Sequence, residues 1–106
     1  MNGAKLPALA GLVLAAALLP LAALAETHTV TMEGMKFQPQ VVTVKRGDTI
    51  VWRNRDVVPH TATAPGLFDS GGIANGKSWS HVASRPGRHD YVCTYHPGMK
   101  ATVVVQ

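Results

Sequence analysis

Apolar and polar residues alternate with a period of two along most of the chain, which is typical of strands that bury one face. The alternation begins at Val30 and Met32, which are separated by threonine, and no stretch keeps the 3.6-residue period of a helix. β-Branched residues reinforce the pattern in the middle and at the end of the chain. Together these signals predict strands at residues 27–32, 40–44, 49–53, 60–64, 79–82, 88–93 and 101–105.

Turn residues separate these predicted strands. Lys45-Arg46-Gly47-Asp48 is a short polar turn, which predicts that residues 40–44 and 49–53 form a hairpin. Residues 65–78, PGLFDSGGIANGKS, are rich in glycine, asparagine and serine and predict a long surface loop. Many short strands with frequent turns and no repeat or linker predict one all-β domain, a Greek-key β-sandwich of about six to eight strands.

The first 25 residues differ from the rest of the chain. One charge, Lys5, precedes a long Ala/Leu run that closes with Ala23-Leu24-Ala25, the small-x-small pattern of a signal-peptidase site. We therefore expect residues 1–25 to be a cleaved export signal and residues 26–106 to form a single periplasmic domain. The alternative is a retained membrane anchor, since residues 6–25 are just long enough to span a bilayer. Pro7 and Pro20 argue against that alternative.

Charge gives little information about partners. Ten Lys and Arg against six Asp and Glu give a formal net charge of +4, and these charges are scattered. The chain has no basic run interleaved with aromatic residues, so a nucleic-acid partner is not expected. We expect a monomer that does not associate with a membrane once the signal is removed.

Cys93 is the only cysteine, which is unusual for a small exported domain. Such domains are commonly held together by disulfides, and this chain cannot form one within itself. The thiol lies in CTYHPGMK, residues 93–100, with His96 three residues later and Met99 three after that. His60, which follows Pro59 at the start of a predicted strand, is the best candidate for a fourth donor.

These four side chains supply two imidazoles, one thiolate and one thioether. A trigonal His₂Cys set with a weak axial methionine is the ligand set of blue-copper electron-transfer centres. Zinc is a rival, but thioether sulfur is a poor zinc ligand. A Cys-His nucleophile is another rival, and its chemistry gives Met99 no role. The donor set therefore favours one copper ion.

The chain from residue 35 to residue 106 resembles the small cupredoxins. The similarity is carried by MKFQPQVVTVKRGDTIVWRNRDVVPH and by GRHDYVCTYHPGMKATVVV, and the spacing C-x2-H-x2-M with proline after the histidine is most similar to the amicyanins. The resemblance implies that His60, Cys93 and His96 are the equatorial copper ligands and that Met99 is the axial one. Two positions depart from the amicyanins: Tyr95 replaces a proline and Gly98 replaces a bulky aromatic residue.

The resemblance also implies roles for residues that surround the ligands. Thr61 and Thr94 are expected to tie the two ligand segments together, with Thr61 at a place where many relatives have asparagine. Pro97 cannot donate a hydrogen bond towards the sulfur, which is expected to shift the reduction potential. The residues expected to support the ligands are Asn54, Pro59, Thr61, Thr94 and Pro97, and the expected partner-docking patch is Met35, Val58, Pro59, Tyr95, His96 and Pro97.

The function implied is that of a periplasmic carrier which moves one electron between redox proteins, such as a dehydrogenase, a cytochrome or an oxidase, and converts no substrate itself. The alternative is a protein that binds copper for delivery or storage. The remaining histidines (His28, His81 and His89) lie in strand-like segments and are expected to be structural. Trp52, Trp79, Phe37 and Tyr91 are expected to lie in the core, whereas the position of Phe68 stays open.

Overall fold

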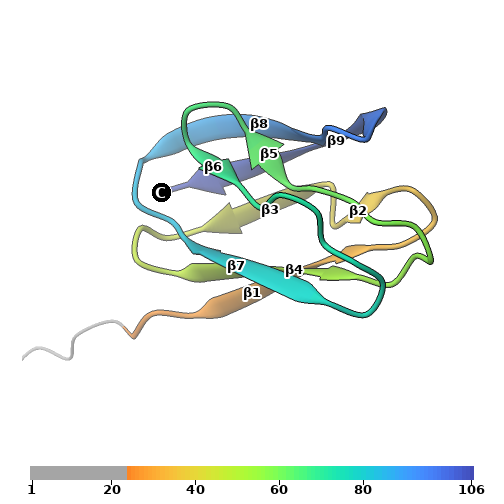
Figure 1. The fold of residues 1–106 in the computed structure, drawn as a ribbon. Helices are drawn as coiled ribbons and strands as arrows, with labels where there is room; N and C mark the ends of the chain where they lie inside the picture. The colour runs from red at the N-terminus through yellow and green to blue at the C-terminus, as the bar shows by residue number, and fades with distance from the viewer. Residues whose placement is uncertain (1–23) are drawn as a thin grey trace, which may run out of the picture.

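The computed structural model describes residues 24–106, and in that part of the chain it contains nine strands and no helix. The strands are β1 (Thr27–Met32), β2 (Phe37–Gln38), β3 (Val41–Val44), β4 (Thr49–Asn54), β5 (Thr63–Ala64), β6 (Phe68–Asp69), β7 (Ser78–Val82), β8 (Gly87–Cys93) and β9 (His96–Val105). They form a two-layered sandwich (Figure 1). The predicted all-β class is confirmed. There are nine strands rather than six to eight, because β2 and β6 have two residues each and are too short to show a period.

Each layer of the sandwich is one sheet. The four-stranded sheet has the order β2-β1-β4-β7, and the five-stranded sheet has the order β3-β9-β8-β5-β6. The pairs β1/β4 and β3/β9 are parallel, and the other strand pairs are antiparallel. The described residues include no helix that is long and apolar enough to cross a membrane. The predicted export signal lies almost entirely outside the described residues.

The predicted hairpin of residues 40–44 and 49–53 is wrong. β3 pairs with β9, with Val44 opposite Val105, whereas β4 pairs with β1 and β7 in the other sheet. The turn between them crosses from one layer to the other, and the buried Asp48 carboxylate holds it by accepting the backbone N–H of Lys45. A short polar turn is compatible with a hairpin and with a crossing, and the local pattern does not distinguish them.

Residues 94–100, between the predicted strands 88–93 and 101–105, are more regular than a connecting loop. β8 continues to Cys93 and β9 begins at His96, so that only Thr94 and Tyr95 form the turn. Cys93 pairs with His96, and the register shifts between Val92 and Cys93. Such a shift changes the direction of the side chains that follow it. Cys93 and His96 therefore lie at the facing ends of β8 and β9, and Met99 lies within β9.

The strand predicted at residues 60–64 and the loop predicted at residues 65–78 also differ from the structure. Only Thr63 and Ala64 form β5, while His60 makes an isolated antiparallel bridge with Ile73. That bridge brings the long loop back against His60, with hydrogen bonds in both directions of 3.1 and 2.7 Å. The loop also contains β6, which pairs with β5.

An aromatic cluster fills the space between the sheets. Trp52 and Tyr91 are fully buried, and the Trp52 indole N–H donates to the Tyr91 hydroxyl at 3.0 Å. Phe37 and Phe68 are buried against them, and Trp79 is partly buried at the edge. The predicted core aromatics are therefore confirmed, and Phe68 is a core residue as well. Burial raises the pKa of the Tyr91 hydroxyl, which stays protonated.

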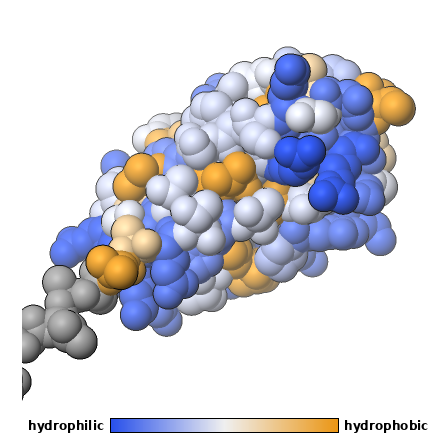
Figure 2. Space-filling model, turned by 90° about the horizontal axis from the view of Figure 1, so that it is seen from below, coloured by the Kyte–Doolittle hydropathy of each residue, from blue (hydrophilic) through white to orange (hydrophobic). Residues whose placement is uncertain are grey.

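The outer surface of the four-stranded sheet is mostly polar. Thr27 and Thr29 of β1 and Ser78 and Ser80 of β7 point to solvent, as the alternation predicts. From below, on the side where β1, β4 and β7 lie in Figure 1, apolar side chains are scattered among polar ones (Figure 2). This face has no continuous apolar surface that would need a partner.

Asp48 fixes the N-terminal end of this sheet. Its carboxylate accepts the backbone N–H groups of Glu26 and Lys45 and contacts His28 Nε2, each at 2.9 Å. These hydrogen bonds, from Glu26 first, lower the pKa of Asp48 to about 2. His28 thus has the structural role that the sequence predicted.

The lowered pKa of Asp48 predicts a loss of stability in acid. The unfolded carboxyl has a pKa of about 3.9, so its contribution to folding is complete above that pH and is lost as the pH falls through about 2. We expect Asp48→Asn to lower the denaturation midpoint at pH 7 and to flatten the pH dependence between about pH 4 and 2. Urea unfolding across this range tests this. Glu33→Gln, at an exposed carboxylate, is the control, and an equal effect of both changes would contradict the role of Asp48.

The Trp52–Tyr91 hydrogen bond gives a second prediction. Tyr91→Phe leaves the buried indole N–H without its acceptor and should reduce the free energy of unfolding by about 1–3 kcal/mol. Tyr95→Phe removes a hydroxyl from a side chain that is half exposed and should change the stability little. Equal losses in the two variants, measured by urea unfolding, would show that the buried bond contributes nothing specific.

Candidate metal centre

His60, Cys93 and His96 meet at one end of the sandwich. The Nδ1 atoms of His60 and His96 lie 3.7 and 3.6 Å from Cys93 Sγ, and one donor atom from each residue lies within 4.8 Å of the others. His60 and Cys93 are fully buried, and His96 is partly exposed. Two imidazole nitrogens facing one thiol sulfur at this spacing can bind a single ion between them.

The other ring nitrogen of His60 is bound to a carboxylate. Asp56 Oδ2 lies 2.8 Å from His60 Nε2. When this Nε2 donates a proton to Asp56, the lone pair of the neutral ring is at Nδ1, which faces the sulfur. A carboxylate that orients a histidine through its outer nitrogen is a common arrangement around bound metals. The donor set and this orientation fit a copper ion.

Asp56 also holds the turn between β1 and β2. Its oxygens accept the backbone N–H groups of Gly34 at 2.8 Å and Met35 at 3.0 Å. Met35 has a φ of 61°, which is unfavourable for a residue with a side chain, and the two hydrogen bonds help to stabilise it there. Burial raises the pKa of Asp56, but the bonds from His60, Met35 and Gly34 together outweigh it and lower the pKa.

Thr61 and Thr94 connect the two ligand segments. The backbone N–H of Thr61 points at Cys93 Sγ from 3.3 Å. The Thr61 hydroxyl accepts the backbone N–H of Thr94 at 2.8 Å and lies 3.1 Å from the Thr94 hydroxyl. Thr61 therefore makes a side-chain tether to the segment after Cys93, as the resemblance implied.

Asn54, at the end of β4, orders the segment that leads to His60. Its side-chain NH₂ donates to the carbonyl groups of Val58 and Ile73, and its side-chain oxygen accepts the N–H of Asp56. The chain from Asp56 to Pro59 is thereby folded so that Asp56 reaches His60 from four residues before it. Asn54 is fully buried, and all of these groups are satisfied.

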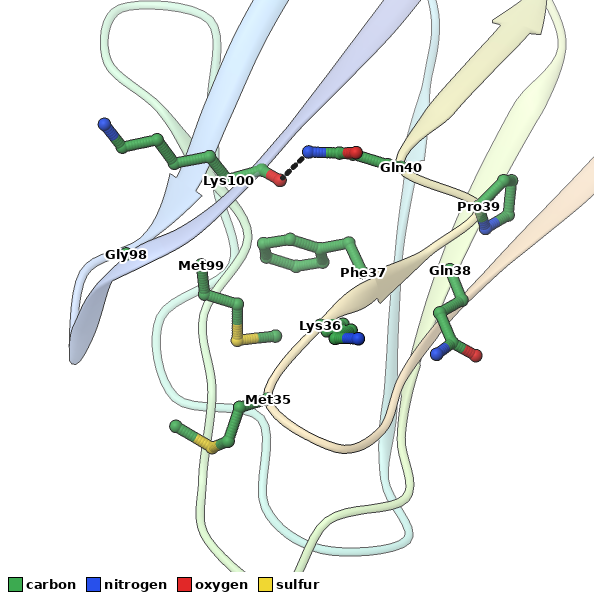
Figure 3. A pocket seen from close by; sticks show the side chains of 9 residues that line it. All are labelled: Met35, Lys36, Phe37, Gln38, Pro39, Gln40, Gly98, Met99 and Lys100. Carbon is green, nitrogen blue, oxygen red and sulfur yellow. Dashed lines mark hydrogen bonds between the residues drawn. The ribbon is translucent and has the colours of Figure 1, made fainter.

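Met99 follows His96 on β9 and is buried. It lines an open cleft of about 410 Å³ between β9 and the β1–β2 turn (Figure 3). Met35 lies across this cleft, and Lys36 and Lys100 lie at its rim. Gln40 donates a 3.4 Å hydrogen bond to the Lys100 carbonyl and closes one side of it. The expected axial donor, Met99, thus lies three residues beyond His96 on the same strand and lines this cleft.

The apolar residues of the expected docking patch are exposed. Met35, Val58 and Tyr95 are exposed by 43%, 38% and 52% of their surface, and Pro59 and Pro97 are exposed as well. Val57 is exposed by 88% and was missed, because nothing in the sequence distinguishes it from a core valine. The Tyr95 ring lies over Gly72, where an added Cβ would be 2.9 Å from the tyrosine hydroxyl. Gly72 therefore makes room for Tyr95.

The sequence pattern did not predict the role of Asp56 in this site. Asp56 lies four residues before His60 and directly after the Asn54-Arg55 pair, but an acidic residue in a loop has many possible roles. Its position between a histidine and two backbone N–H groups is set by the β1–β2 turn, which is distant in sequence.

Comparisons with known proteins agree with this geometry. A family model described as cupredoxin-like domain matches residues 6–105. Amicyanin-alpha of Methylorubrum extorquens is 35% identical over 78 residues, which cover 68% of this chain and 66% of that protein. Plastocyanin of Scenedesmus fuscus is 34% identical over 84 residues, which cover 66% of this chain and 86% of that protein. The match to amicyanin-alpha thus spans just under two thirds of that relative's length.

Solved structures give the same result. The Cu(I) form of a methionine-to-alanine mutant of amicyanin superposes with a TM-score of 0.70 at 30% identity, covering 81% of this chain and 86% of that one. A copper-containing nitrite reductase from Thermus scotoductus has the same TM-score at 27% identity, but the match covers only 23% of that enzyme. With its two-layered sandwich and a His, Cys, His and Met set arranged as a type 1 copper site, the chain belongs to the cupredoxin family.

Proposed function

We propose that this cupredoxin is an exported one-electron carrier in which His60, Cys93, His96 and Met99 hold one copper ion. The observation that carries the proposal is the convergence of two histidine Nδ1 atoms on Cys93 Sγ, with the outer nitrogen of His60 already bound to Asp56. Copper, when bound to such a set, supplies a centre that accepts and releases one electron.

The surrounding residues keep the donor atoms in place. Cys93 and His60 are buried in the sandwich, and Thr61 N–H donates to the sulfur from the neighbouring segment. Thr94 is tied to Thr61, and Pro97 offers no N–H to the sulfur. A rigid donor set changes little when its charge changes, which favours electron transfer over substrate chemistry. Asn54 and Pro59 support this by shaping the approach to His60.

Electrons are proposed to enter and leave through the exposed edge of His96. The docking patch is then Met35, Val58, Pro59, Tyr95, His96 and Pro97, with Val57 added. Apolar residues around one partly exposed ligand suit a brief encounter with another redox protein, such as a dehydrogenase, a cytochrome or an oxidase. The resemblance to the amicyanins implies methylamine dehydrogenase as the partner. Tyr95 and Gly98 differ from the amicyanin pattern, so this partner is not part of the proposal.

The burial of the donors distinguishes this proposal from copper delivery or storage. A protein that hands over copper needs donors that can exchange, whereas His60 and Cys93 are inaccessible behind the patch. We also propose that the protein is not an enzyme. The nitrite reductase that shares the fold is about four times as long as its matched part. Most of that enzyme therefore lies outside the domain that resembles this chain.

Export is proposed from the small-x-small pattern before Glu26. The environment of Glu26 supports this position for cleavage: its backbone nitrogen lies 2.9 Å from Asp48 Oδ1. An α-ammonium group created at Glu26 would therefore meet a buried carboxylate and form an ion pair with it. Residues 26–106 would then be the mature, monomeric, periplasmic protein.

The copper centre is tested by adding Cu(II) to the purified protein. We expect an intense thiolate-to-copper absorption band and a narrow copper hyperfine splitting in electron paramagnetic resonance. Both should be lost in Cys93→Ser, since the sulfur is the source of the band. A pale Cu(II) spectrum that the substitution leaves unchanged would reject this site and favour copper delivery or storage.

Cleavage is tested by the mass of the protein recovered from the periplasm of a bacterial host. We expect the chain to begin at Glu26, and a chain recovered from membranes with residues 1–25 attached would contradict the proposal. We also expect the chain that begins at Glu26 to unfold at higher urea concentration at pH 7 than one with two extra residues before Glu26. The difference should shrink above about pH 8, where an α-amino group loses its charge, and in the Asp48→Asn background.

A further inference from the structure

A chain of hydroxyl groups runs from the ligand turn to the surface. Starting beside Cys93, it joins the side-chain oxygens of Thr94, Thr61, Thr63 and Asp69, with successive distances of 3.1, 3.0 and 3.1 Å. Thr61 and Thr63 are buried, and Asp69 is exposed on β6. The β5–β6 pairing places Thr63 directly opposite Asp69. Among these four side chains, only that of Asp69 carries a charge.

The charge sets the direction of every hydrogen bond in the chain. An ionised carboxylate only accepts hydrogen bonds, so the Thr63 hydroxyl must donate to Asp69. A hydroxyl has one proton, so Thr63 can only accept from Thr61. Thr61 has then used its own proton and accepts from Thr94, both from the backbone N–H and from the hydroxyl. All three hydroxyl protons thus point away from the metal centre.

This direction has two consequences at Cys93. Successive hydrogen bonds polarise one another, and Thr61 and Thr63 are buried, so the Thr61 oxygen becomes a stronger acceptor for the Thr94 N–H. The bond dipoles also turn their negative ends towards the metal centre, and negative potential there stabilises Cu(II) relative to Cu(I). Both effects begin at Asp69, which touches none of the proposed ligands.

We propose that Asp69 is a positioning residue that lowers the reduction potential of the copper centre through the Thr63–Thr61–Thr94 hydroxyl chain. The proposal rests on the proposed function for its effect on the potential, but the direction of the hydrogen bonds is a property of the metal-free protein as well. A direct field from the exposed Asp69 charge is the competing explanation, and solvent and salt screen such a field.

A double-mutant cycle separates the two explanations. Asp69→Asn keeps the shape of the side chain and an oxygen for the Gly71 N–H, which Asp69 accepts at 3.0 Å, but it removes the charge. Thr63→Val keeps the shape and breaks the chain. Thr63→Ser keeps the hydroxyl and is the matched control for Thr63→Val, whereas Asp90→Asn is the control for removing an exposed charge elsewhere.

The first measurement is the midpoint potential of each copper-loaded variant at fixed pH and salt. Asp69→Asn should change the Cu(II)/Cu(I) equilibrium two- to fivefold in favour of Cu(I), which raises the potential by about 20 to 40 mV at 59 mV per tenfold change. The same substitution should have no further effect in the Thr63→Val background and its full effect in the Thr63→Ser background. Equal shifts in all three backgrounds, or a similar shift from Asp90→Asn, would reject the relay.

The second measurement is the hydrogen exchange of the Thr94 amide in the metal-free protein. Asp69→Asn should speed this exchange severalfold in the wild-type and Thr63→Ser backgrounds and leave it unchanged in the Thr63→Val background. Exchange that is unaffected by Asp69→Asn would overturn the proposal. If the wild-type protein forms no thiolate-to-copper band, the proposed function fails. The exchange measurement still decides whether Asp69 acts on the Thr94 amide through the threonine hydroxyls.

Discussion

The hydrogen bond from the Thr61 N–H to Cys93 Sγ, 3.3 Å long, is the contact on which the metal centre depends. It joins the segment that begins at His60 to the end of β8, and these two segments are 32 residues apart in the sequence. The pairing of Thr63 with Val92 in β5 and β8 sets their relative position. Because this pairing is part of the five-stranded sheet, the fold itself sets the relative position of the two donor segments.

Asp56 connects the same centre to the protein surface. One carboxylate binds the outer nitrogen of His60 and also the backbone of the turn that presents Met35. A change in the position of that turn would therefore displace His60 through the Asp56 side chain. The turn and the buried ligand segment lie close together because they follow the paired C-terminal ends of the parallel strands β1 and β4, where Met32 is opposite Asn54. Buried polar groups in this region all have partners, which limits the ways in which it can rearrange.

The aromatic core makes this arrangement rigid. Trp52 lies in the four-stranded sheet and Tyr91 in the five-stranded sheet, and their hydrogen bond joins the two layers beneath the site. Tyr91 lies two residues before Cys93, so its anchoring also fixes the end of β8. A domain of this size has a small core and no disulfide, so each contact between the layers contributes a large share of its stability.

Much of this protein could be predicted from its sequence, because the signals are local. Alternation with a period of two gives the strand class, and the spacing of Cys93, His96 and Met99 gives the donor types. The pairing of strands could not be predicted in the same way. Residues 40–44 and 49–53 were predicted to form a hairpin, but β3 and β4 lie in different sheets, since a turn of four residues does not encode which partner each strand takes. Asp56, Thr63 and Asp69 were missed for a related reason. Their roles come from neighbours brought close by the sheets, and only the tertiary structure decides which oxygen faces which nitrogen.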